Sequence, residues 1–215
     1  MKAPLTCKDQ WCYELEAESH MRKKYNIILS AEESFARIVA LGVMVKKPLT
    51  VWHYLIPGMF ILDFLTRTSE VNKYSKNFLF PRKLAIDAAL DIINGEDREK
   101  RISRIGEEIE KWLRSLELYS LDLYNSQMEE INLLIEHYSA LLNAEGDSHN
   151  ALIKSAYNNQ ENYEAFLYRL ASTENNVDQA IVEKLGESEL LSKRLLAEKQ
   201  QVEKLRKKNV DIIFN

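Results

Sequence analysis

Glycine and proline are scarce in this chain, which has only 6 glycines and 4 prolines among 215 residues. Together the two types average about 12% of a protein sequence, so this chain has few positions suited to tight turns. Strictly alternating runs of Val, Ile and Thr, which are typical of half-buried strands, are also absent. The apolar fraction of 46% and the charged fraction of 29% are those of a folded protein. The sequence therefore predicts an all-α protein.

We expect an elongated helical bundle with two regions. Residues 1–94 form a helical region that contains an apolar, basic-flanked helix–break–helix hairpin at 35–67. Residues 95–215 form an acidic region of long, partly coiled-coil-like helices, with 16 basic against 23 acidic side chains.

Hydrophobic periodicity and the positions of glycine and proline place the expected helices. In the first region they lie at 13–45, 49–56, 59–67 and 82–94, with a short helix or loop at 68–81 that ends at Pro81. In the second region they lie at 96–145, 149–171 and 177–208, with 172–176 as a hinge or a polar helical turn. Gly95 is expected to terminate one helix, and Asp147 or Ser148 to cap another.

Recognisable catalytic and metal-binding motifs are missing. Cys7 and Cys12 have the wrong spacing for a zinc site, and no phosphate-binding glycine loop, nucleophile elbow or His-Glu-x-x-His motif occurs. No histidine follows a glutamate by three residues, as di-iron bundles require. We therefore expect a non-enzymatic protein with no metal and no cofactor. His137 is expected near the surface.

The start of the chain has no apolar segment of the secretory type, so we expect a cytoplasmic protein with reduced thiols. The sequence pI of 5.7 and the absence of a known binding module argue against nucleic acid as a partner.

The most distinctive stretch of the sequence is 35–65, which carries only four charged residues and is interrupted by Lys-Lys-Pro and by Pro57-Gly58. Three interpretations remain open. The stretch is a buried core hairpin, a monotopic membrane contact, or a single span at 49–66. Each arm of the hairpin is only about 12 Å long as a helix, far short of the roughly 30 Å of membrane hydrocarbon.

Positive charge surrounds the same stretch. Residues 37–83 contain 8 basic and only 2 acidic side chains. Positive flanks on both sides fit a hairpin that enters and leaves on the cytoplasmic side, and they favour anionic lipid. The basic flank consists of Lys46, Lys47, Arg67, Lys73, Lys76, Arg82 and Lys83.

These patterns predict a helical adaptor or scaffold, attached through residues 35–83 to the cytoplasmic face of a membrane or to a membrane protein. A helical protein partner or a second copy of the chain is a further expected partner. The predicted contact residues are Leu49, Trp52, His53, Tyr54, Ile56, Met59, Phe60 and Leu62. The alternative is a soluble helical domain that binds a small ligand or acts as an enzyme, with its pocket at His53, Tyr54, Asp63 and Arg67.

Overall fold

The computed structural model describes residues 7–44 and 59–215, and within them it forms seven helices and no strand. The helices are α1 (Cys7–Met44), α2 (Met59–Ile93), α3 (Arg98–Ser115), α4 (Leu121–Asn143), α5 (His149–Tyr157), α6 (Gln160–Leu185) and α7 (Glu189–Phe214). The predicted all-α class is confirmed, while the coiled-coil character of the C-terminal helices stays a prediction.

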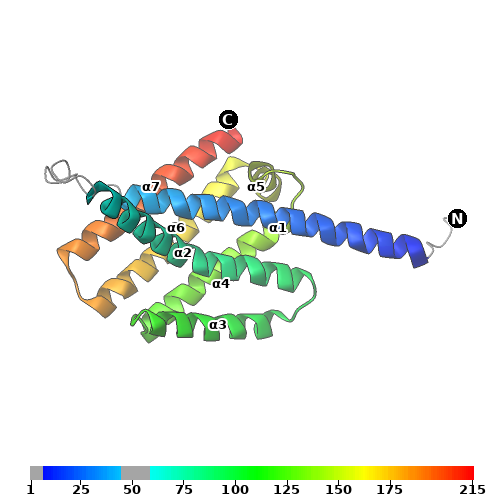
Figure 1. Ribbon diagram of the computed structural model, residues 1–215. Coiled ribbons are helices and arrows are strands. Elements are labelled where there is room, and N and C mark those ends of the chain that lie inside the picture. Colours follow the sequence, from blue (N-terminus) through cyan, green and yellow to red (C-terminus); the bar gives the residue numbers. More distant parts are fainter. Residues whose placement is uncertain (1–6, 45–58) are drawn as a thin grey trace.

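Five of the helices close a ring. α1 packs on α2, α2 on α4, α4 on α6, α6 on α7, and α7 on α1 (Figure 1). α3 packs outside this ring against α2 and α4, and α5 lies against α4, α6 and α7. α4 is the most enclosed helix, since 11 of its 23 residues are buried. Its fully buried side chains Ile131 and Leu141 pack in one core with Ile28, Ile86 and Ile109 from α1, α2 and α3.

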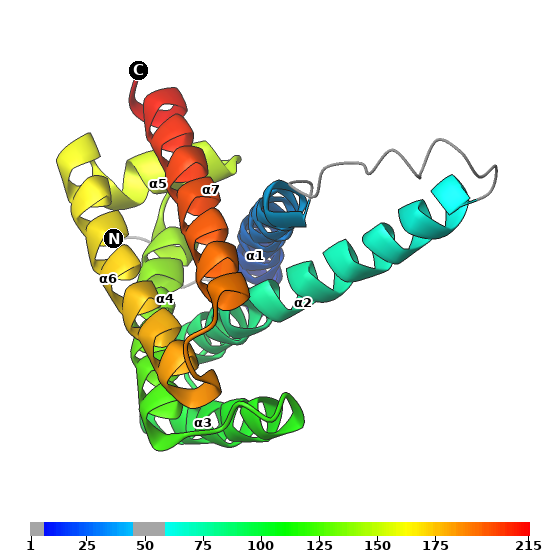
Figure 2. The same cartoon turned by 90° about the vertical axis from the view of Figure 1, so that its left-hand side faces the viewer.

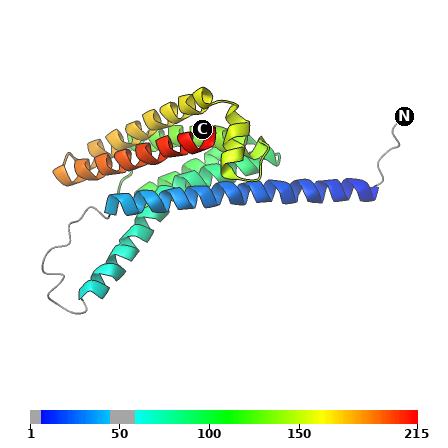
Figure 3. The ribbon, with the colours of Figure 1, turned by 90° about the horizontal axis from the view of Figure 1, so that it is seen from above.

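Two helices extend beyond the ring at their N-terminal ends. The first turns of α1 project past the other helices (Figures 1 and 3). The first turns of α2 diverge from the bundle (Figures 2 and 3). Burial along α2 agrees with this arrangement, because no residue from 69 to 80 is buried, whereas residues 84–86 all are. α2 therefore enters the core only in its C-terminal half.

The prediction that a helix ends at Pro81 is wrong, because α2 runs through it to Ile93. Proline in a helix interior removes one hydrogen bond and costs about 3 kcal/mol. Here the flanking turns are fixed by packing against α1 and α4, which compensates for that cost. α2 changes direction along its length, as expected for a helix with an interior proline (Figure 1). The structure describes α2 from Met59 onward, and the predicted helix end at Gly95, with φ of 98°, is confirmed.

The single predicted helix at 96–145 is also wrong, because the chain turns a corner between α3 and α4. Leu118 N–H donates to the Leu113 carbonyl at 2.9 Å, and Glu117 N–H donates to the Arg114 carbonyl at 3.0 Å. This pair of bonds is the Schellman ending of a helix, which places Glu117 in the left-handed region with φ of 60°. Ser120 then caps α4. The corner has no glycine, so no local signal in the sequence predicts it.

Two more boundaries differ from the prediction. The predicted helix 149–171 is split between α5 and α6, where Asn158 has φ of 64° and Asn159 caps α6. Residues 172–176 are a polar helical turn within α6, and Gly186 separates α6 from α7. The predicted cap at Ser148 is confirmed.

Replacing Glu117 with glycine is expected to stabilise the protein. A non-glycine residue in the left-handed conformation costs about 1–2 kcal/mol, and glycine avoids this strain. Urea denaturation should therefore show Glu117→Gly to be more stable than Glu117→Ala by about 1 kcal/mol. The alanine variant is the control, since it removes the same exposed side chain but keeps Cβ. Equal stability of the two variants would show that the corner is not strained.

Candidate functional site

The structure describes only part of the predicted docking region. Lys46, Lys47, Leu49, Trp52, His53, Tyr54 and Ile56 lie outside the described residues. Met59, Phe60, Leu62, Asp63 and Arg67 belong to the diverging first turns of α2. Lys73 and Lys76 follow on the same helix and are exposed. Lys83 is exposed as well, and it pairs with Asp87 at 2.6 Å.

Arg82 must be removed from the predicted basic flank. Its side chain is buried, with the residue only 4% exposed, so it is not available to a lipid headgroup. Its Nη1 lies 3.3 Å from Glu32 Oε2, and its Nη2 lies 2.8 Å from Glu174 Oε1. The guanidinium also lies 4.7 Å from the centre of the Phe78 ring. Such a desolvated arginine serves to join helices inside the bundle.

Arg82 is part of a buried ion network, which we define as Glu32, Arg82, Glu174 and Arg206. Glu174 accepts two bonds from Arg206, both at 2.7 Å, and a third from Arg82. The four side chains come from α1, α2, α6 and α7. Burial alone would raise the pKa of Glu174, but Arg206 and Arg82 outweigh burial and hold this pKa below its ordinary value. The network therefore retains its charges inside the ring of helices.

A cavity of about 360 Å³ lies next to this network, between α2, α4, α6 and α7. Arg82, Glu174 and Arg206 form part of its wall, so the network separates it from the α1 side of the bundle. Apolar and aromatic side chains make up much of the remaining wall. These are Phe78, Trp112, Leu116, Leu118, Val177, Ile181, Leu195 and Val202. Its volume is in the range of small-molecule sites in proteins.

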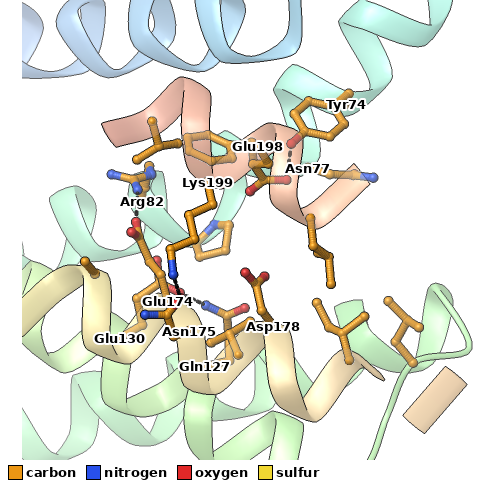
Figure 4. A pocket seen from close by; sticks show the side chains of 18 of the residues that line it. Tyr74, Asn77, Arg82, Gln127, Glu130, Glu174, Asn175, Asp178, Glu198 and Lys199 are labelled. Atoms are coloured by element: carbon orange, nitrogen blue, oxygen red, sulfur yellow. Dashed lines mark hydrogen bonds and ion pairs between the residues drawn. The ribbon is translucent and has the colours of Figure 1, made fainter. Parts of the chain in front are cut away.

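Four further carboxylates line the cavity, and none has a cationic partner within ion-pair distance among the described residues. Glu203 on α7 is exposed, and the three less exposed ones are Glu130 on α4, Asp178 on α6 and Glu198 on α7. Asp178 and Glu198 point toward one another (Figure 4). Glu130 accepts a bond from Gln127 Nε2 at 2.8 Å, and Glu198 accepts one from the Tyr74 hydroxyl. Lys199 lines the same cavity but donates to Asn175 at 3.1 Å.

Burial and mutual repulsion change the protonation of these groups. Burial, followed by the charge of Glu174, raises the pKa of Glu130 to about 7. Burial and the charges of Glu198, Glu174 and Glu130 raise the pKa of Asp178 to about 7. Burial also raises the pKa of Glu198. Carboxyl groups that lose a proton near neutral pH in a cavity are typical of functional sites.

His137 is buried, contrary to the prediction that it lies near the surface. It stacks on Phe166 with ring centres 4.3 Å apart, and its Nδ1 lies 2.7 Å from the Tyr157 hydroxyl. Burial and the neighbouring His149, Arg82 and Arg206 lower its pKa well below the ordinary value, so it is a neutral core residue. No group of three or more Asp, Glu, His and Cys side chains in the described part of the chain is arranged to hold a metal ion.

Sequence reasoning missed the carboxylates of the cavity because charged residues are usually exposed. A signal was present in their spacing. Gln127 and Glu130 fall on the stripe of the apolar residues Leu123 and Leu134, at positions three and four residues apart. Glu174 likewise falls between Leu170 and Val177 on the stripe of α6. A carboxylate on an apolar stripe indicates a buried site.

Comparisons with protein-family models, curated proteins and solved structures found no match for this chain, so its function is inferred from its own residues.

Neutralising Glu130 should change how stability depends on pH. An acid whose pKa is raised on folding favours the folded state only while protonated, so stability falls as the pH rises from about 4.5 toward 7. Glu130→Gln is expected to remove part of this fall. The free energy of unfolding should rise by up to about 3 kcal/mol at pH 8 and change little at pH 4.

Urea titrations at both pH values measure this effect. Glu129→Gln is the matched control, because the neighbouring Glu129 is exposed and has no role in the cavity. Parallel pH profiles for the wild type and Glu130→Gln would contradict the assigned protonation of Glu130.

Proposed function

We propose that this protein is a non-enzymatic helical adaptor that docks through residues 35–83 on the anionic, cytoplasmic face of a membrane. The ring of helices is the body of the adaptor, and the C-terminal end of α1 and the N-terminal turns of α2 flank residues 45–58, the docking segment. The long helices α6 and α7 are then free to present a surface to a helical protein partner or a second copy of the chain. Exposed Leu185, Leu190 and Leu196 on or near these helices support that part of the proposal.

The observation that carries the proposal is the packing of the C-terminal end of α1. This segment is apolar on nearly every side, yet only one face of it is packed: Ala36, Val39 and Ala40 are fully buried. Ile38 and Leu41 remain 45% and 43% exposed. Residues three apart on a helix lie on the same face. These two side chains thus form an apolar surface at the entrance to the docking segment, and such surfaces mark interaction sites.

Charge supports a membrane surface as the partner. Lys73 and Lys76 are exposed on the outer part of α2, close in sequence to the docking segment. A basic residue near an anionic membrane contributes about 1 kcal/mol of attraction. No helix in the described part of the chain is long and apolar enough to cross a membrane. The single span at 49–66 that the sequence left open lies largely outside the described residues.

A second candidate function is a soluble small-ligand-binding domain. The cavity between α2, α4, α6 and α7 favours it, although this cavity is not at the pocket expected from the sequence at His53, Tyr54, Asp63 and Arg67. The two functions share part of α2, because the cavity residues Tyr74, Asn77, Phe78, Pro81 and Arg82 lie within residues 35–83.

Removing the exposed apolar pair should abolish docking without unfolding the protein. The double variant Ile38→Ser, Leu41→Ser is expected to lose most of its binding to vesicles that contain anionic lipid, because its apolar contact is lost. Flotation on a density gradient measures the bound fraction. The unfolding free energy should change by no more than about 1 kcal/mol, since both side chains are exposed.

The matched control is Leu121→Ser, Ile212→Ser, which removes the same two residue types from exposed positions on α4 and α7. This control should float like the wild type. If the wild type itself remains at the bottom of the gradient with anionic vesicles, the membrane proposal fails. If the wild type binds only vesicles that carry a membrane protein, then that protein, and not the lipid, is the docking partner.

A further inference from the structure

The cavity carries more negative than positive charge. The basic side chains in its wall are Arg82, Arg206 and Lys199, and both arginines are already paired with Glu174. Glu130, Asp178 and Glu198 are left without a cation among the described residues. Glu130 is the clearest case, because it is only 8% exposed and its single described donor is the neutral amide of Gln127. A buried carboxylate without a cation is costly, and a positive ligand would remove that cost.

The backbone of α2 beside the cavity also lacks one hydrogen-bond donor. Pro81 has no N–H, so the carbonyl oxygen of Asn77, four residues earlier, lacks its helical donor. Asn77 and Pro81 both line the cavity. A ligand that brings N–H groups can bond to this oxygen as well as to the carboxylates. A ligand that suits this cavity therefore donates hydrogen bonds and carries a positive charge.

The aromatic and aliphatic residues of the cavity wall determine which kind of ligand body fits. Phe78 and Trp112 present aromatic surface, and Val177, Ile181 and Leu195 present aliphatic surface. Aromatic faces attract cations and also pack well against flat rings. A fully hydrated inorganic ion gains nothing from such a wall, and no three ligating groups converge as a metal site requires in the described part of the chain.

We propose that this cavity binds a small organic cation, a protonated primary amine attached to an apolar or aromatic body. The ammonium group lies between Asp178 and Glu198, which point toward one another, and the body lies against Phe78 and Trp112 (Figure 4). This site is separate from the docking surface of α1. It goes beyond the adaptor function and gives the second candidate function a chemical class of ligand.

Two pairs of probes that differ only in charge test the proposal. Tryptamine is compared with indole-3-propionate, and phenethylamine with 3-phenylpropionate, by isothermal titration calorimetry and thermal melting in phosphate buffer without vesicles. Each amine is expected to bind and to raise the melting temperature, because a ligand that binds only the folded state stabilises it. Each carboxylate is expected to bind at least about tenfold more weakly, because it adds a like charge to the cavity.

Variants then locate the site. Asp178→Asn and Glu198→Gln should each weaken amine binding about tenfold or more, which corresponds to one charged hydrogen bond. Both remove repulsion between neighbouring carboxylates, so the melting temperature without ligand should not fall. If one of the two variants fails to fold, the other provides the measurement. Glu183→Gln is the control on α6, since Glu183 is exposed and does not line the cavity.

Three results would overturn the proposal. The first is that neither amine binds at concentrations up to about 10 mM, well above the typical range of specific small-ligand affinities. The second is that amines and carboxylates bind equally well. The third is that both cavity variants bind amines as tightly as the wild type does. Vesicle flotation of the same variants is expected to be normal, so failure here is distinct from failure of the adaptor function.

Discussion

The ion pairs that Glu174 makes with Arg82 and Arg206 are the constraint on which the rest of this bundle depends. Removing charged groups from water costs several kcal/mol for each ion, and only good geometry and complete pairing offset that cost. Glu174 accepts from both arginines, and Arg82 reaches a second carboxylate at Glu32. The four helices that carry these side chains must therefore pack in one register, because only then are all the charges paired. Residues far apart in the sequence, from α1 to α7, close the ring at this point.

The same constraint determines where space is left in the protein. Side chains that surround a charged network cannot all be apolar, and they cannot fill every gap around planar guanidinium groups. Cavities occur on two sides of the network, and both have Arg82 and Arg206 in their walls. The cavity on the side of Glu130, Asp178 and Glu198 has acidic groups beyond those the arginines neutralise. The paired charges of the network and the acidic cavity beside it are thus two results of one arrangement.

Local signals in the sequence predicted much of the fold but not its corners. The all-α class, the stop at Gly95 and the cap at Ser148 follow from composition and end signals. The corner at Glu117 was missed because tertiary packing holds a non-glycine residue in a left-handed conformation that usually belongs to glycine. The sequence predicts a helix end at Pro81, since the cost of an interior proline is visible there while the compensating contacts of α2 are not. The candidate site could be predicted least, because burial of Glu130 or Arg82 depends on which helices meet around it.

One continuous helix, α2, reaches from the cavity wall to the docking region. Arg82 lies in the cavity wall, and Met59 lies 23 residues before it on the same helix. At the usual rise per residue, this part of α2 is about 35 Å long. A tilt of about 10° around the proline would move the far end by about 6 Å, while the near end moves by less than the length of a bond. A small tilt at Pro81 would therefore displace the far end of α2 by much more than the cavity wall.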